Sequence, residues 1–420
     1  MLVSLMKGVF VILDGAADEP VSRLGDKTPL EFSKTPNLDF FASKGEIYSC
    51  FPIAEGVAPQ SSSGMISLLG ADFRDCPRGL IEALGAGVHL NQGDLALRCN
   101  FSTIEDMNSM KIIDRRAGRT LTNVEATQLA DAVNSKVKLP YKFELIHTEG
   151  HRAVLIFRGA FSANISNIDP SYDLGLSVEK PSDFAELSKP LDDSARAKLT
   201  ADLVNTFIKK SYIVLDNHPV NIARKKKGFF PANFILCRDA GTGPARAVKM
   251  QGSWAGFGYM PLEKGIVKLF GMRLSTFNVP PMNEDDFYKH AEIVLDAAIK
   301  NSIKMIEEYS DLVDYIYIHF KETDLPGHDN KPLQKVRFIE MIDKDFFGYL
   351  RNLDLDFKMV VTSDHTTSCR MKSHTSNPVP VVFYDSKSVK DSGKRFIEKD
   401  SVNGKSFNGR QLLSKTLFLK

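Results

Sequence analysis

The run Lys358-Met359-Val360-Val361-Thr362-Ser363-Asp364-His365-Thr366 decides the fold of this chain. Its first part is largely apolar and β-branched, which is typical of a buried strand, and it stops at an Asp-His pair. Open α/β folds bind their ligands at the carboxyl edge of the sheet. We therefore expect this strand to deliver two metal-binding side chains there, and we expect other strand ends to deliver matching ligands.

Three further places in the sequence carry such ligands. Asp14 directly follows the apolar run 8–13, Asp324 and His328 follow the apolar run 314–320, and His374 precedes the run 378–384. Asp14-Gly15 alone is also typical of a turn or helix cap, and each histidine alone is typical of a structural residue. Together, Asp and His suit Mn²⁺ or Zn²⁺ better than Ca²⁺. Two such ions would activate a nucleophile and clamp a phosphoryl group.

Strands and helices alternate on both sides of these ligands. We expect strands at 8–13, 314–320, 358–362 and 378–384, and helices at 285–309 and 333–350. The prolines of 378–384 favour an edge strand or the start of a strand. Thr28-Pro29 and Thr35-Pro36 are expected to begin helices, with threonine as the cap. The stretch 59–66 follows a loop rich in Gly and Pro and is expected to lead into another helix at 66–69. Its serine triplet, 61–63, would lie at the helix N-terminus, which favours an anion; a plain helix cap is the other interpretation.

The section from 94 to 245 has a different character and reads as an α+β unit. We expect strands at 95–101, 151–157 and 233–238 and helices at 123–137 and 194–209. Its turn 114–119 carries Arg115, Arg116 and Arg119. Such a turn is suited to binding phosphate and carboxylate, but it also fits a solvated loop, and the sequence leaves both open. The glycine-rich stretch 240–244 lacks the lysine and hydroxyl of a nucleotide-binding P-loop.

Composition indicates an ordinary globular protein long enough for two domains. The 420 residues are 43% hydrophobic and 25% charged, and the net charge of +2 argues against a nucleic-acid partner. Five cysteines without a CxxC pair favour a reducing, cytoplasmic setting. Since no segment approaches the roughly 20 apolar residues of a membrane-spanning helix, we expect no membrane partner. The oligomeric state, including a homo-oligomer, stays open.

The order and spacing of these motifs resemble the alkaline phosphatase superfamily and, within it, the archaeal-type cofactor-independent phosphoglycerate mutases. The resemblance covers nearly the whole chain. It is carried by 11–15, 27–30, 34–39, Arg78 to Gly87, Leu97 to Phe101, Asp114 to Arg119, Asp324 to His328, and Asp364-His365-Thr366. It implies an alkaline-phosphatase-like mixed sheet flanked by helices, with residues 1–93 and 246–420 as the metal-binding core and 94–245 as an inserted α+β lid domain that clamps the substrate.

The resemblance also assigns site residues. It implies that Asp14, Ser61, Asp364 and His365 surround one metal ion and that Asp324, His328 and His374 hold a second. Ser61 would be the nucleophile. The family pattern usually continues with Asp-Thr-Ala-His where this chain has Ser62-Ser63-Gly64-Met65, so Ser62 remains the alternative. The substrate would be held by Arg115, Arg116, Arg119, Arg152 and Lys264.

The function implied by the resemblance is the interconversion of 3-phosphoglycerate and 2-phosphoglycerate through a phosphoserine. It would need two divalent ions, Mn²⁺ or Zn²⁺ with Mg²⁺ as a further candidate, and no 2,3-bisphosphoglycerate. The partner would be a small phosphorylated substrate. A metal-dependent phosphatase or phosphodiesterase of the same superfamily is the alternative, because the metal ligands alone do not distinguish hydrolysis from transfer.

Overall fold

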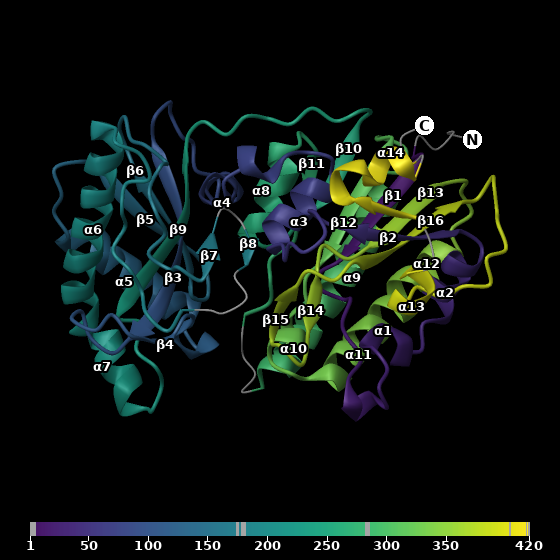
Figure 1. The fold of residues 1–420 in the computed structure, drawn as a ribbon, viewed down its shortest axis with the longest axis horizontal. Helices are drawn as coiled ribbons and strands as arrows, with labels where there is room; N and C mark the ends of the chain where they lie inside the picture. The colour runs from purple at the N-terminus through teal and green to yellow at the C-terminus, as the bar shows by residue number, and fades with distance from the viewer. Residues whose placement is uncertain are drawn as a thin grey trace. The chain divides into compact units, whose positions relative to one another are not determined.

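The structure is a computed structural model that describes residues 6–173, 176–177, 182–281, 286–402, 405–416 and 418. The chain divides into two compact units, which we describe separately (Figure 1). Unit 1 consists of Met1–Phe73, Ala247–Tyr259 and Phe270–Lys420, and unit 2 consists of Arg74–Arg246 and Met260–Leu269. Among the described residues, no helix is long and apolar enough to cross a membrane.

Unit 1 is built on a mixed sheet with β1 at its centre. The strand order is β11-β10-β12-β1-β13-β16-β2-β17. The sheet is parallel from β11 to β13, and β16 runs antiparallel to both of its neighbours. The strand bounds are β1 Gly8–Leu13, β2 Glu46–Phe51, β10 Trp254–Phe257, β11 Arg273–Ser275, β12 Tyr315–Phe320, β13 Lys358–Thr362, β16 Val379–Asp385 and β17 Ser406–Asn408.

The predicted central strand is confirmed, because every residue of β1 is buried and the strand pairs with β12 and β13. Two positions were predicted for the proline-containing run, an edge strand or the start of a strand. The start of a strand is confirmed, because Pro380 is the second residue of β16, whereas an edge position is wrong. β16 lies inside the sheet, between β13 and β2. Pro380 is tolerated there because the β13 ladder begins only at Val381, so the missing N–H of proline interrupts no bond on that side.

Helices of unit 1 connect and cover these strands. The Thr28 cap is confirmed: its side chain accepts from Glu31 N at 3.0 Å. Thr35 makes no side-chain cap bond, and the N-terminus of α2 is instead capped by Asp343, which accepts from Leu38 N at 2.7 Å. The bounds are α1 Pro29–Phe32, α2 Pro36–Ser43, α3 Ser61–Leu68, α9 Phe287–Tyr309, α10 Leu325–His328, α11 Pro332–Met341, α12 Gly348–Arg351, α13 Glu398–Val402 and α14 Leu412–Lys415.

Two predicted helices differ in detail from the structure. The helix predicted at 333–350 contains a π-helical stretch, Ile342–Phe347, between α11 and α12. That stretch includes Asp343, the residue that caps α2. The first residue predicted for the helix at 285–309, Asp285, lies outside the described residues, and α9 begins at Phe287.

Unit 2 contains a second sheet covered by helices on both faces. β3 is its long central strand and pairs with β4, β6 and β9. The apolar side chains of α5 and α6 pack on one face, and those of α4 pack on the other. Figure 1 shows α5 and α6 on one side of this sheet and α4 on the other. The bounds are α4 Arg78–Gly85, β3 Leu95–Ile104, β4 Ile112–Asp114, α5 Asn123–Lys136, β5 Phe143–Glu149, β6 Arg152–Phe157, β7 Tyr172–Asp173, β8 Leu176–Ser177, α6 Ala195–Asp216, α7 Pro219–Lys226, β9 Phe234–Thr242 and α8 Pro261–Leu269.

Close packing of α4 against α8 explains why residues 260–269 belong to unit 2. A side chain at Gly85 would meet Pro261 O at 1.8 Å, and one at Gly265 would meet Ile81 O at 2.0 Å. Only glycine permits such an approach of two helix backbones. Unit 2 therefore contains the insertion expected at 94–245 and, beyond it, residues 74–93 and 260–269, which contact the same α+β sheet.

Candidate metal centre and arginine cluster

The parallel strands of unit 1 bring the predicted ligands to one edge of the sheet. Leu13 pairs with Phe320 and Ile12 pairs with Thr362, so β1, β12 and β13 end side by side. The residues that follow these ends are therefore neighbours, as predicted. Asp14 follows β1, the segment containing Asp324 follows β12, and Asp364-His365 follows β13.

A first ligand group is fully buried. His365 Nε2 lies 3.2 Å from Asp14 Oδ1 and 3.4 Å from Asp364 Oδ2. Ser61, the first residue of α3, places its Oγ 3.2 Å from His365 Nε2 and 3.5 Å from Asp14 Oδ1. These contacts belong to Ser61, whereas Ser62 is the next residue of the same helix. Asp14, Asp364 and His365 form a group whose ligand atoms could hold one metal ion.

A second ligand group adjoins the first. Asp324 Oδ2 lies 3.4 Å from His328 Nε2, and Asp324 Oδ1 lies 3.6 Å from His374 Nε2. The imidazole rings of His365 and His374 are stacked, with centroids 3.6 Å apart. Asp324, His365 and His374 also form a group that could hold an ion. His365 is thus common to both candidate groups.

The histidine rings are oriented by their outer nitrogens. His374 Nδ1 lies 2.7 Å from Pro59 O, and His328 Nδ1 lies 3.0 Å from Lys372 O. Because a carbonyl oxygen only accepts, both Nδ1 atoms must carry the proton. The two Nε2 atoms then face each other at 3.2 Å. Such a pair needs either a shared proton or a cation, and the donor set of imidazole nitrogens and carboxylates fits a divalent metal ion.

The buried charges of the first group depend on one another. Burial and the neighbouring Asp14 raise the pKa of Asp364. Burial opposes ionisation of Asp14 as well, but Lys321 and His365 outweigh it and hold the pKa of Asp14 below its usual range. Burial opposes the charge on His365, yet Asp364 and Asp14 raise the pKa of His365 to about 9. The carboxylates therefore attract positive charge into this site.

The sequence interpretation missed two basic residues beside the first group. Lys321 Nζ lies 2.7 Å from Asp14 Oδ2, and buried His319 lies 3.6 Å from the same oxygen. Both belong to the segment at the end of β12. The sequence feature that could have indicated Lys321 is its position, because it directly follows β12 just as Asp14 directly follows β1.

Close packing of α3 against Asp364, which follows β13, positions Ser61. A side chain at Gly64 would meet Asp364 O at 2.2 Å, so the first turn of α3 lies against the backbone of a candidate ligand. Gln60 and Ser63 form a reciprocal cap at the start of the helix. The altered segment Ser62-Ser63-Gly64-Met65 is therefore compatible with an ordered helix N-terminus.

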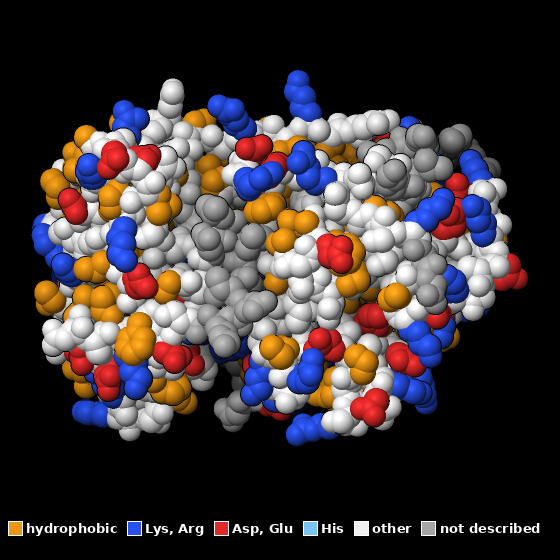
Figure 2. Space-filling view, viewed as in Figure 1, with side chains coloured by type: hydrophobic (Ala, Val, Ile, Leu, Met, Phe, Trp, Pro, Cys, Tyr) orange, Lys and Arg blue, Asp and Glu red, His pale blue; other side chains and the backbone are white. Residues whose placement is uncertain are grey.

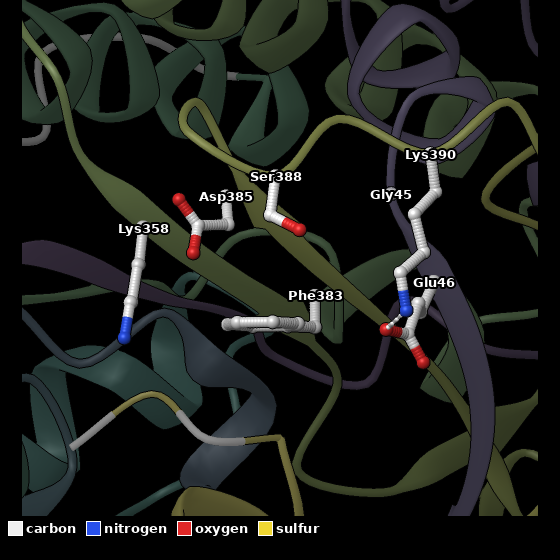
Figure 3. A pocket seen from close by; sticks show the side chains of 7 residues that line it. All are labelled: Gly45, Glu46, Lys358, Phe383, Asp385, Ser388 and Lys390. Atoms are coloured by element: carbon white, nitrogen blue, oxygen red, sulfur yellow. Dashed lines mark hydrogen bonds and ion pairs between the residues drawn. The ribbon is translucent and has the colours of Figure 1, made fainter. Parts of the chain in front are cut away.

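A separate surface hollow in unit 1 lies at the other end of β13 (Figure 3). It has a volume of about 190 Å³, below the roughly 300 Å³ at which small-molecule pockets begin. Lys358 begins β13 there, and Lys390 forms an ion pair with Glu46. The candidate metal ligands are at the opposite end of the strand, so the hollow is no part of their site.

Unit 2 carries a cluster of arginines on the α4 face of its sheet. Arg98 lies opposite Arg238 on β9, and its neighbour on the same face, Asn100, lies opposite Arg152 on β6. From α4, Arg78 Nε donates to Glu82 Oε1 at 2.7 Å, and Arg98 Nε lies 3.4 Å from the same oxygen. We call Arg78, Arg98, Arg152 and Arg238 the arginine cluster. The sequence signal for it was the alternation along β3, where Arg98 and Asn100 alternate with the apolar residues Leu97, Cys99 and Phe101 and therefore share one face of the strand.

Glu82 is one of three buried acidic residues beside the arginine cluster. Of the other two, Asp239 lies 3.5 Å from Arg238, and Glu263 opposes the lowering of the pKa of Arg152. Burial alone would raise the pKa of Glu82, but Arg98, Arg78 and Arg152 hold that pKa at about 2. Burial lowers the pKa of Arg98 to about 9, with Glu82 opposing this shift and Arg238 adding to it. The four arginines therefore face three buried acidic residues, and the remaining positive charge favours an anionic ligand.

The predicted substrate residues of unit 2 occupy different environments. Arg115 is bonded to Asp169 at 3.2 Å and to Ser171 Oγ at 2.7 Å, so its guanidinium is already bound within the protein. Arg116, Arg119 and Arg152 are half-buried. Burial lowers the pKa of Arg152, and nearby arginines, including Arg116, add to that shift. Lys264 is half-buried on α8.

An α/β sheet whose strand ends gather acidic and imidazole ligands around a helix-terminal serine defines a candidate metal-dependent phosphoryl-transfer protein. Comparison with known proteins makes this specific. The family model described as 2,3-bisphosphoglycerate-independent phosphoglycerate mutase matches residues 42–221. A protein of that name from Thermococcus kodakarensis is 36% identical over 95% of this chain and 93% of its own length. One from Aeropyrum pernix is 36% identical over 99% of both chains.

Solved structures agree with the sequence relatives. The cofactor-independent phosphoglycerate mutase of Thermoplasma acidophilum is 28% identical, with a TM-score of 0.58 over 98% of this chain and 99% of that chain. A Pyrococcus horikoshii protein of known structure is 27% identical, with a TM-score of 0.74 over 99% of this chain and 97% of that chain. This chain belongs to the 2,3-bisphosphoglycerate-independent phosphoglycerate mutase family, and is thus a member of a family of isomerases. The predicted family and α/β fold class are confirmed.

Proposed function

We propose that this chain interconverts 3-phosphoglycerate and 2-phosphoglycerate through a phosphoserine at Ser61, in a site that holds two divalent metal ions. The observation that carries this proposal is the position of Ser61 Oγ, 3.2 Å from His365 Nε2 and 3.5 Å from Asp14 Oδ1, in a member of this mutase family. The phosphoserine and the two ions are inferences from that position and from the ligand chemistry.

In the proposed site, Asp14, Ser61, Asp364 and His365 hold one ion, and Asp324, His328 and His374 hold the other. Mn²⁺ and Zn²⁺ suit this mixture of carboxylates and imidazoles, and Mg²⁺ is a further candidate. Bound ions would supply positive charge to the phosphoryl oxygens and lower the pKa of the serine hydroxyl. The reaction would use no 2,3-bisphosphoglycerate.

Phosphoryl transfer through Ser61 takes place in two steps. Ser61 Oγ forms a bond to phosphorus as the bond from phosphorus to the C3 oxygen of the substrate breaks, and that oxygen takes up a proton as the serine loses one. In the second step, the C2 oxygen of the retained glycerate forms a bond to phosphorus as the bond from phosphorus to Ser61 Oγ breaks. The C2 hydroxyl loses its proton and Ser61 Oγ takes one up, which regenerates the serine. The N–H groups at the start of α3 favour negative charge on both Ser61 Oγ and the phosphoryl group.

The arginines of unit 2 are the proposed holders of substrate anions. Excess positive charge around Glu82 supports binding of a carboxylate or phosphate, and Arg116, Arg119, Arg152 and Lys264 remain the candidates. Arg115 is proposed to act by stabilising the turn through Asp169. The predicted insertion at 94–245 would serve as the lid that keeps water from the phosphoserine. We expect the reaction to take place in the cytoplasm.

Phosphorus NMR of purified protein with Mn²⁺ and 3-phosphoglycerate tests the proposal directly. We expect 2-phosphoglycerate to accumulate to equilibrium with little free phosphate. Free phosphate without 2-phosphoglycerate would instead establish the phosphatase alternative.

Basic and acidic side chains are intermixed on the face shown in Figure 2. Among the described residues on that face, no basic stripe of the kind typical of a nucleic-acid site is seen.

Two serine variants identify the nucleophile. Ser61→Ala should abolish both transfer and the phosphoprotein detected by mass spectrometry, while metal binding weakens only slightly because the other ligands remain. Ser62→Ala should retain both the transfer activity and the phosphoprotein, and it is the matched control from the same helical turn. A phosphorylated Ser61→Ala protein would transfer the assignment to Ser62.

A further inference from the structure

Thr367 occupies an enclosed position between the two ligand groups of unit 1. It belongs to β14 (Thr366–Ser368), is fully buried, and lies opposite His374 on β15 (Ser373–Thr375). Two glycines make room for it. A side chain at Gly15 would meet Thr367 Oγ1 at 2.3 Å, and one at Gly327 would meet Thr367 Cγ2 at 2.6 Å. The local sequence is thus adapted to a threonine at this point.

The Thr367 hydroxyl links the two groups by hydrogen bonds. Thr367 Oγ1 lies 2.8 Å from Asp324 Oδ1 and 2.9 Å from His365 Nδ1. A hydroxyl has one proton to donate. When that proton is donated to the Asp324 carboxylate, a lone pair of Oγ1 faces His365, and His365 Nδ1 must be the nitrogen that carries hydrogen. His365 Nε2 is then directed at Ser61 and Asp14 as a ligand atom.

Lys335 fixes the backbone that carries this hydroxyl. Its side chain is fully buried. Nζ donates to Thr367 O at 2.8 Å, to Asp18 Oδ2 at 2.9 Å and to Ala17 O at 3.2 Å. Thr367 N also donates to Ala17 O at 3.0 Å. The loop after β1 and the strand β14 are therefore joined by one buried ammonium directly behind the ligands.

We propose that Thr367 is a positioning residue of the metal centre: its hydroxyl sets the Nδ1–H tautomer of His365 and fixes that ring relative to Asp324, so that both ligand groups are preorganised together. The inference rests on the proposed function, because it presumes that the groups bind ions. It completes a common pattern, since His328 and His374 also donate from Nδ1, in their case to carbonyl oxygens. Outer hydrogen bonds of this kind orient ligating histidines and increase their basicity.

Calorimetric titration of the metal-free full-length chain with Mn²⁺ tests this role. Thr367→Val keeps the shape and removes the hydroxyl, so we expect Mn²⁺ affinity to fall by about 10- to 100-fold. Thr367→Ser restores the hydroxyl and should recover most of the affinity. Thr416→Val is the matched control. Thr416 is equally buried in unit 1, and within the described part of the chain its hydroxyl bonds only to its own helix turn, at Leu412 O.

Unchanged Mn²⁺ affinity in a folded Thr367→Val protein would overturn the inference, as would failure of Thr367→Ser to recover it. A wild-type chain that binds no ions or leaves 3-phosphoglycerate unchanged would instead overturn the proposed function. A measurement on the wild type covers the case in which the valine variant fails to fold. The nitrogen-15 spectrum of the zinc-loaded protein, assigned with His365→Gln, should show hydrogen on His365 Nδ1, and hydrogen on Nε2 would refute the inference.

Discussion

Replacing Glu82 by glutamine would remove the negative charge at the centre of the arginine cluster while keeping nearly the same shape. Glu82 is 1% exposed, and its Oε1 is the acceptor that faces both Arg78 and Arg98. Glutamine can still accept a hydrogen bond from Arg78. The variant therefore isolates the contribution of charge, since the guanidinium groups of the cluster would be left without this counter-ion.

The pKa of Glu82 gives the size of the effect. It is held at about 2, against an ordinary value of 4.5. Each pKa unit is worth about 1.4 kcal/mol, so the ionised carboxylate contributes about 3 kcal/mol to folding at pH 7. Because the folded-state pKa is the lower one, this contribution is present above about pH 4.5 and is lost as the pH falls toward 2. At pH 3.5 about 2 kcal/mol should remain.

Amide hydrogen exchange of β3 at pH 7 measures this energy in unit 2 itself. Glu82→Gln should speed exchange of the slowest β3 amides by about 100-fold, corresponding to about 3 kcal/mol. Glu186→Gln is the control, since Glu186 forms an exposed pair with Lys189 at 3.2 Å and should change exchange little. Urea unfolding followed by circular dichroism at pH 7 and pH 3.5 tests the pH dependence. Exchange in Glu82→Gln at the wild-type rate would refute the reasoning.

Two further substitutions examine unit 1. Gly64→Ala should lower kcat at least tenfold while the far-ultraviolet circular dichroism spectrum stays unchanged, because an added Cβ would displace α3 from Asp364 O and move Ser61. Gly348→Ala is the control, since its Cβ would meet its nearest neighbour at 3.4 Å, and equal kcat values for the two variants would contradict the prediction. Lys335→Met should lower the free energy of unfolding by about 3–5 kcal/mol, because Asp18 would lose its buried partner. Lys300→Met, which breaks an exposed pair, should have little effect in the same urea titration, and a similarly small loss in Lys335→Met would show that the buried pair contributes nothing.

The sequence was most informative where a buried strand ends abruptly. Asp14, Asp324 and Asp364 could be anticipated because apolar runs stop beside them, and parallel strands bring such ends together. A helix N-terminus at the serine triplet 61–63 could likewise be anticipated from the preceding loop, and α3 begins at the first of these serines. These features depend on local sequence and on general rules of sheet topology.

The supporting residues could not be anticipated, because their partners are distant in the sequence. Thr367 is separated from Asp324 by 43 positions, and Lys335 from Asp18 by 317. Nothing near either residue indicates a buried hydrogen bond. The sequence left an edge strand and a strand start open for β16 for a related reason. Whether a proline is tolerated inside a sheet depends on where the neighbouring ladder begins, which is a property of register.

The outer hydrogen bonds of the histidines suggest why the ligands are held by so many different segments. His374 donates to the loop before α3, His328 donates to the turn between β14 and β15, and His365 contacts β14 itself. The ring orientations of His328 and His374 therefore depend on segments other than their own, whereas that of His365 depends on Thr367, two positions along the chain. Because these acceptors come into place only when α3 and the β14–β15 hairpin have docked on the sheet, a correctly oriented ligand set should exist only in folded unit 1, and ion binding would stabilise that fold in return.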